Sequence, residues 1–162
     1  FASLNTLCMI TTPNGVQYYY WYALSLFIFL WSNDTGAYVF GSLLGKHKLF
    51  ERISPKKTWE GSIGGGLTAI IASQIIASFE PFTSTVSGIE NNLLWAGLAL
   101  LTVIMGTWGD LVESLFKRKV GIKDSGNILP GHGGMLDRFD SSLIAIPTAV
   151  IYIYTIMLNL HL

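Results

Sequence analysis

Four stretches of the chain are apolar and about as long as a membrane-spanning helix, which needs about 20 mostly apolar residues. They cover residues 16–32, 61–79, 93–112 and 142–160. The first is short by itself, and we expect residues 35–45 to extend it after a break at Asn33-Asp34. Tyrosines and tryptophans in 16–32 favour the membrane interface, and glycines at the start of 61–79 allow close approach of another helix.

The composition agrees with a membrane location. Of the 162 residues, 51% are hydrophobic and only 12% are charged, about half the charged fraction of a typical soluble domain. A single cysteine, Cys8, excludes an internal disulfide and a cysteine-rich metal site. We therefore expect an all-α integral membrane protein with about four transmembrane helices, forming one membrane-embedded region over residues 1–162. Because the chain begins at Phe1 and carries no recognisable signal peptide, we expect it to be part of a longer protein.

The basic residues are confined to two loops. The acidic segment 80–92, between the second and third apolar stretches, contains Glu80 and Glu90 but no Lys or Arg. The positive-inside rule therefore predicts that both basic loops are cytoplasmic, with 80–92 and the C-terminus on the other side. An alternative is that the basic residues serve topology alone. The ten residues are Lys46, Lys48, Arg52, Lys56, Lys57, Lys117, Arg118, Lys119, Lys123 and Arg138.

The second basic loop, Ser114 to Asp140, combines basic residues, aspartates, one histidine and five glycines. Glycine permits positive φ and leaves backbone N–H groups accessible, which suits a site for phosphate or another anion. The segment Pro130-Gly131-His132-Gly133-Gly134 is a strong turn signal. It could also be a tight turn that needs glycine only for its geometry.

Carboxylates flank this loop on both sides. Asp110 and Glu113 share a helical face with Lys117 near the end of the third apolar stretch, and Asp137 and Asp140 share a face before the fourth. A carboxylate at the membrane is a functional candidate by default. Two simpler explanations exist for individual residues. Asp137 and Asp140 could compensate a helix dipole, and Glu113 could form a simple i,i+4 ion pair with Lys117. Neither explains why carboxylates from two helices converge beside so many cations.

Carboxylates beside lysines and arginines suit the chemistry of phosphate transfer. Hard oxygen ligands favour Mg²⁺, which bridges substrate phosphates, and the basic side chains neutralise the remaining negative charge. The chain has no Walker A motif, kinase signature or dinucleotide-binding fingerprint. A nucleotide site here must therefore follow another design.

The loop sequence resembles the signature of the phosphatidate cytidylyltransferase (CDP-diacylglycerol synthase) family. That signature reads Ser-x-hydrophobic-Lys-Arg, four residues, Lys-Asp-x-small, two residues, then hydrophobic-Pro-x-His-Gly-Gly-hydrophobic-x-Asp-Arg-hydrophobic-Asp, and every position is filled between Ser114 and Asp140. The segments Asp34-Thr35-Gly36-Ala37-Tyr38 and Ser54-Pro55-Lys56-Lys57-Thr58-Trp59-Glu60-Gly61 are also similar to the family. The resemblance covers most of residues 31–145 and implies the C-terminal catalytic part of a longer membrane protein.

The resemblance implies a nucleotidyltransferase of phospholipid biosynthesis, which joins phosphatidate to CTP and yields CDP-diacylglycerol and pyrophosphate with Mg²⁺ as cofactor. It also implies a homodimer in a bacterial plasma membrane with its active site on the cytoplasmic side, and no nucleic-acid partner. The metal ligands it implies are Asp110 and Asp137, with Asp140 as a further ligand. The candidate catalytic residues are Lys57, Lys117, Arg118, Lys123, His132 and Arg138, and the candidate substrate-binding residues are Ser54, Lys56, Gly133 and Gly134.

Several alternatives remain open from the sequence. A CTP-dependent lipid kinase of the dolichol or phytol type would use a similar basic membrane site, and an ion-conducting transporter subunit could use Asp110 and Asp137 along its path. His132 could act as an acid or base or donate a hydrogen bond to phosphate. Asp34 could cap a helix after the expected break, or line a polar cavity.

Overall fold

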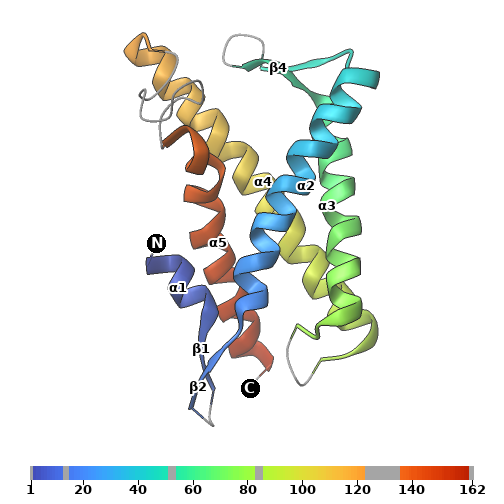
Figure 1. Ribbon diagram of the computed structural model, residues 1–162, viewed down its shortest axis with the longest axis vertical. Helices are drawn as coiled ribbons and strands as arrows, with labels where there is room; N and C mark the ends of the chain where they lie inside the picture. The colour runs from blue at the N-terminus through green and yellow to red at the C-terminus, as the bar shows by residue number, and fades with distance from the viewer. Residues whose placement is uncertain (1, 13–14, 51–53, 83–85, 123–135, 161–162) are drawn as a thin grey trace.

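The computed structural model describes residues 2–12, 15–50, 54–82, 86–122 and 136–160. Five helices account for most of these residues, and two short antiparallel hairpins accompany them (Figure 1). The all-α class is therefore confirmed in its main elements, although the hairpins were not predicted. In chain order the elements are α1 (Ala2–Cys8), β1 (Met9–Thr12), β2 (Gly15–Tyr18), α2 (Tyr20–Leu44), β3 (Lys48–Phe50), β4 (Ser54–Thr58), α3 (Trp59–Phe79), α4 (Gly88–Val120) and α5 (Leu136–Leu160).

Three helices in the described part of the chain are long and apolar enough to cross a membrane. They are α3, α4 and the segment Phe139–Ile156 of α5. The expected number was about four, and α2 is the helix that does not qualify. Although α2 has 25 residues, its apolar centre is flanked by an aromatic start and a polar stretch.

The expected break at Asn33-Asp34 is wrong, because α2 runs without interruption from Tyr20 to Leu44. Asn33 is buried where α2 packs on α3, and a Cβ on Gly65 of α3 would lie 2.5 Å from its Oδ1 atom. The Thr68 hydroxyl of α3 also donates a hydrogen bond of 2.8 Å to the Ser32 carbonyl. Close packing against a glycine-rich helix therefore accommodates the polar residues of α2 without a break in the helix.

The ends of the helices follow ordinary capping rules. Thr58 precedes α3, and its hydroxyl accepts a 3.1 Å hydrogen bond from the Gly61 N–H, as an N-cap residue does. Helix α4 ends at Val120 and is followed by Gly121, whose φ of 77° is the left-handed conformation that glycine adopts without strain. Basic residues occupy the last turn of α4, where they interact favourably with the helix dipole.

An aromatic cluster forms the core near the start of α2 and α4. Tyr22, Phe82 and Trp95 are almost completely buried and stack edge-on or tilted against one another. The Tyr22 hydroxyl donates to the Phe82 carbonyl, and Trp95 Nε1 donates to the Glu80 carbonyl at 3.0 Å. Asn91 accepts from the Phe82 N–H at 2.5 Å and donates to the Ala77 carbonyl at 2.9 Å. These bonds hold the end of α3 and Phe82 against the first turns of α2 and α4.

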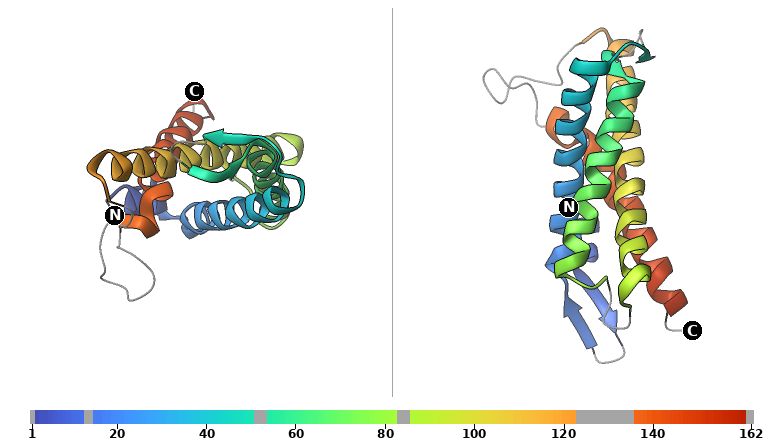
Figure 2. Two further views of the ribbon diagram at one scale, coloured as in Figure 1. Left: turned by 90° about the horizontal axis from the view of Figure 1, so that it is seen from above. Right: turned by 90° about the vertical axis from the view of Figure 1, so that its right-hand side faces the viewer.

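The two basic segments lie at the same end of the molecule. The β3–β4 hairpin, the last turns of α4 and the start of α5 gather at one end, whereas the β1–β2 hairpin and the connection after α3 lie at the other (Figures 1 and 2). We call the first of these the basic end. The relative placement of the loops predicted from the charge pattern is thus correct, and the assignment of the basic end to the cytoplasm stays a prediction.

Candidate functional site

The ion pair between Lys57 and Asp110 joins the two basic segments. Lys57 lies on β4 in the first segment, and Asp110 lies on α4 ahead of the second. Both side chains are half-buried, so they are accessible to a ligand while remaining partly shielded from water. The other oxygen of Asp110 accepts a hydrogen bond of 3.3 Å from the Ser114 hydroxyl one turn further along α4. Both residues were predicted as site residues, and the structure shows that they are in direct contact.

Two cavities meet at Asp34. The smaller one, about 210 Å³, is also lined by Asn33, Lys56 and Lys57, with Thr107 on its α4 side. The larger one, about 660 Å³, lies between α2, α4 and α5. Asp34 lies inside the continuous helix α2, so it does not cap a helix. Of the two expected roles, it takes the second and lines a polar cavity. The larger cavity is lined by Phe27, Leu30, Trp31, Asp34, Asp110, Phe139, Asp140, Ser141 and Ser142.

The close approach of α4 and α5 brings Asp110 and Asp140 to the same cavity. A Cβ on Gly109 would lie 2.6 Å from the Asp140 carbonyl oxygen and 3.2 Å from the Ser141 Cα, so only glycine allows this spacing. The Asp140 carboxylate accepts hydrogen bonds from the N–H and the hydroxyl of Ser141, at 2.5 and 3.2 Å. The packing of α5 thus places a third carboxylate beside Asp34 and Asp110.

Glu113 and Lys117 form the i,i+4 ion pair that was considered as an alternative explanation for these two residues. The Lys117 ammonium lies 3.5 Å from the Glu113 carboxylate, and both side chains are largely buried. The Asp140 carboxylate of α5 also faces Glu113, so this largely buried group has another carboxylate on one side and the Lys117 cation on the other. The cation beside it offsets part of the cost of its burial.

The described residues do not by themselves assemble a metal cluster: no group of three or more His, Cys, Asp or Glu side chains there is close enough to hold an ion. The donor types nevertheless fit Mg²⁺, since Asp34, Asp110 and Asp140 present hard oxygen atoms to one cavity. Asp137 lies in the first turn of α5, but its side chain is outside the described part. The predicted ligand set therefore stays a prediction.

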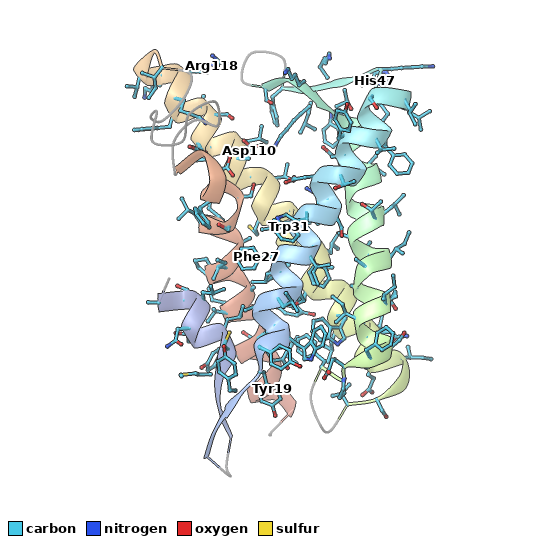
Figure 3. The ribbon with its side chains drawn as sticks, viewed as in Figure 1. Tyr19, Phe27, Trp31, His47, Asp110 and Arg118 are labelled. Carbon is cyan, nitrogen blue, oxygen red and sulfur yellow. The ribbon has the colours of Figure 1, made fainter. Side chains whose placement is uncertain are left out.

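The remaining predicted residues divide by location. Lys56 lines the smaller cavity, and Ser54 lies on the same strand, β4. Arg118 is exposed near the end of α4, two turns beyond Asp110 (Figure 3). Arg138 lies in the first turn of α5 with its side chain outside the described part, and Lys123, His132, Gly133 and Gly134 lie wholly outside it.

Sequence reasoning missed two contributions to the site. The first is made by Asn33 and Thr107, which line the smaller cavity. Polar residues within apolar helices are a recognisable signal for such a role.

The second is the contact between Glu60 and His47. Glu60 in the first turn of α3 accepts a hydrogen bond from the His47 N–H at 3.2 Å and lies 2.6 Å from His47 Nδ1. This contact ties the segment after α2 to the start of α3, and the β3–β4 hairpin that carries Lys56 and Lys57 lies between them.

Comparison with known proteins places the chain in a family. The sequence model of the cytidylyltransferase family matches residues 2–156, nearly the whole chain, and the chain belongs to this family. The phosphatidate cytidylyltransferase of Staphylococcus saprophyticus is 50% identical over 129 residues, which cover 78% of this chain and 46% of that protein. The Staphylococcus haemolyticus enzyme of the same name is 47% identical over 145 residues, covering 82% of this chain and 52% of that protein. The chain thus spans about half the length of these relatives.

A solved structure has a similar fold. It is described as an intramembrane enzyme for archaeal membrane lipid biosynthesis, and it matches with a TM-score of 0.55 over 88% of this chain and 92% of that chain. The two sequences are 20% identical, so the likeness concerns the fold alone.

Proposed function

We propose that the protein containing this chain is a phosphatidate cytidylyltransferase, which transfers CMP from CTP to phosphatidate. The contact between Lys57 and Asp110 is the observation that best supports the proposal, because it joins the two signature segments at cavities bordered by carboxylates and lysines. Family membership and the named staphylococcal relatives support the same activity. The smaller cavity is lined by Lys56 and Lys57 of the basic end, which suits a reaction at the level of lipid headgroups. The larger cavity extends from Asp34 and Asp110 toward Phe27 and Trp31, near the middle of α2 (Figure 3).

In the proposed reaction, an oxygen of the phosphatidate phosphate attacks the α-phosphorus of CTP. A new P–O–P bond forms, the α–β phosphoanhydride bond breaks, and its electron pair leaves with pyrophosphate. The attacking oxygen is already anionic near neutral pH, so the reaction needs little help from a general base. The main task of the protein is to bring two polyanions together, and charge-assisted contacts from lysines and arginines serve that purpose.

The described residues can take specific parts in this task. Lys56 and Lys57 line the smaller cavity and would bind phosphate groups, with Asp110 and Ser114 holding Lys57 in position. We assign Lys117, Arg118 and Arg138 to further phosphate contacts, and Gly133-Gly134 to backbone contact with the nucleotide. Lys123, His132 and Ser54 complete the polar set, with His132 as a hydrogen-bond donor to phosphate.

We assign the metal site to Asp110 and Asp137, with Asp140 as a further ligand. When bound, Mg²⁺ would supply positive charge that offsets the negative charge of the phosphates and of the leaving group. The protein's own contribution is to hold the Asp110 and Asp140 carboxylates on two packed helices at one cavity, as the packing of Gly109 on Asp140 does. We further propose that the enzyme works as a homodimer in a bacterial plasma membrane, with this site on the cytoplasmic side.

The position of a radioactive label tests the proposal. The full-length protein in membranes is given phosphatidate, Mg²⁺ and CTP labelled at the α-phosphate. We expect the label in a lipid-soluble product and an equal amount of pyrophosphate in the aqueous phase. Label that stays in water-soluble CDP, with transfer of the γ-phosphate to lipid, would identify a CTP-dependent lipid kinase instead.

A further inference from the structure

An apolar groove of about 390 Å³ lies beside the candidate site. Strand β3 and the start of α3 form one side, and the second half of α4 forms the other. Its size falls within the range of small-molecule sites, roughly 300 to 1,000 Å³. The side chains that define its character are Leu49, Phe50, Trp59, Ile104, Trp108 and Leu111.

The groove adjoins the polar cavity that is lined by the two lysines. Ser62 of α3 and Thr107 of α4 line both spaces, so the apolar groove and the cavity with Lys56 and Lys57 meet at these two residues. A ligand that occupied both would need an anionic group joined directly to an apolar chain. A phospholipid with a phosphate headgroup has this chemistry, whereas a water-soluble nucleotide would leave the apolar part unfilled.

Two tryptophans mark the depth of the groove in the membrane. Trp59 and Trp108 border it and are 55% and 64% exposed, and tryptophan side chains concentrate at the level of lipid headgroups. Ile104 lies one helical turn from Trp108, toward the membrane interior. The groove therefore begins at headgroup level and extends between two membrane-spanning helices toward the hydrocarbon region.

We infer that this groove binds the headgroup-proximal part of one acyl chain of the lipid substrate while Lys56 and Lys57 bind its phosphate. The inference rests on the proposed function, because it names where the lipid of that reaction lies. Binding of a second copy of the chain, or coverage of the groove by another part of the full-length protein, would leave no room for the acyl chain. Both are outcomes that the experiments below would reveal.

The first experiment fills the groove and varies the length of the lipid chain. The substitution Ile104→Trp in the full-length protein enlarges a side chain that lines the groove. The control is Leu100→Trp, one turn away on the same helix, which has nearly the same exposure (47% against 44%) but does not line the groove. The measurement is KM for dioleoyl phosphatidate and for dihexanoyl phosphatidate, together with KM for CTP.

We expect Ile104→Trp to raise KM for the dioleoyl lipid at least tenfold, because excluding two methylenes from an apolar site weakens binding by roughly that factor. KM for CTP should change less than twofold, and KM for the dihexanoyl lipid should rise as well, because its six-carbon chains include the part that the groove binds. Leu100→Trp should change none of the three. Equal effects of the two substitutions, or an equal rise in KM for CTP and for the lipids, would overturn the inference.

A second experiment detects the lipid without using activity. The full-length wild-type protein is placed in phosphatidylcholine vesicles that contain a small, fixed fraction of lipid brominated near the headgroup end of its chain. Bromine quenches tryptophan fluorescence on contact. We expect brominated phosphatidate to quench more than brominated phosphatidylcholine or phosphatidylglycerol at the same fraction. The excess should disappear in the double variant Trp59→Phe, Trp108→Phe.

The two experiments separate failure of the inference from failure of the proposed function. If the wild-type protein converts neither lipid, the proposed function is wrong, and the fluorescence experiment still decides whether the groove binds phosphatidate. Equal quenching by all three brominated lipids would mean that the groove has no preference for the substrate, or is covered, and would overturn the inference. Excess quenching that persists in the double variant would also overturn it, because the lipid would then bind elsewhere.

Discussion

Lys57 of β4 forms an ion pair with Asp110 of α4, so a residue of the first basic segment is held directly against the helix that leads into the second. The contact brings together two short sequence signatures that are separated along the chain by a complete membrane-spanning helix. Asp34, from a third element, α2, lines the cavities on either side of this contact. The site is thus built by the packing of α2, α3 and α4, with α5 adding Asp140.

The substitution Lys57→Ala should lower cytidylyltransferase activity about 10- to 150-fold, since a lost charge-assisted phosphate contact costs roughly 1.5–3 kcal/mol. The matched control is Lys48→Ala, which removes a lysine from β3 of the same hairpin but does not border either cavity. The measurement is kcat/KM in membranes with CTP and phosphatidate. Similar losses in both variants would mean that the basic residues serve topology and not catalysis.

The substitution Gly109→Ala should impair both stability and activity. Its new Cβ would overlap the Asp140 carbonyl, so α4 and α5 must separate, and such overpacking typically costs about 1–3 kcal/mol. Gly66→Ala in α3 is the control, because nothing lies within 4 Å of a Cβ at that position. Thermal unfolding in detergent and the rate of lipid product formation would be measured for both. Unchanged activity in Gly109→Ala would show that the close approach of the two helices is not needed at the site.

Single cysteines at positions 48, 87 and 119 test the topology, in a background where the buried Cys8 is replaced by alanine. A membrane-impermeant reagent should label positions 48 and 119 from the cytoplasmic side only, and position 87 from the other side only. This follows from the common location of the basic segments at one end of the molecule (Figure 1). Labelling of 48 and 119 from opposite sides would separate the two halves of the site and contradict the described packing.

The metal assignment predicts that Asp110→Asn and Asp137→Asn each abolish turnover at ordinary Mg²⁺ concentration while the protein stays folded in the membrane. Asparagine preserves size but removes the anionic ligand. The double variant should lose little more than either single variant, because residues that serve one metal act as a unit. Rates would be measured over a range of Mg²⁺ concentrations. A single variant with nearly normal activity and Mg²⁺ dependence would remove that aspartate from the metal site.

The long apolar runs made the membrane helices predictable, and the charge pattern predicted which loops lie together. The break at Asn33-Asp34 was wrong because the effect of two polar residues on a helix depends on what packs against them, here Gly65 of α3 and a polar cavity. The hairpin β3–β4 was missed because its second strand, Ser54–Thr58, carries a proline and two lysines and has no alternating apolar pattern.

The site residues were predictable as types but not as contacts. Asp110 and Lys57 are recognisable from their motifs, yet their pairing depends on how three helices pack, which no local pattern specifies. Asp34 was ambiguous for the same reason, since its role depends on whether α2 continues past it. The ion pair between Lys117 and Glu113, in contrast, was predictable as a contact. Their i,i+4 spacing on one helix allows the pair, and the structure contains it.

Isotopic oxygen tests the central claim most directly. Phosphatidate carrying ¹⁸O in its phosphate group is converted by the full-length protein with unlabelled CTP and Mg²⁺, and both products are examined by mass spectrometry. Attack by the lipid phosphate on the α-phosphorus predicts that all the ¹⁸O stays in CDP-diacylglycerol, one atom of it in the new P–O–P bridge, and that pyrophosphate carries none. Formation of a lipid diphosphate together with CDP, or ¹⁸O in the pyrophosphate, would contradict the account.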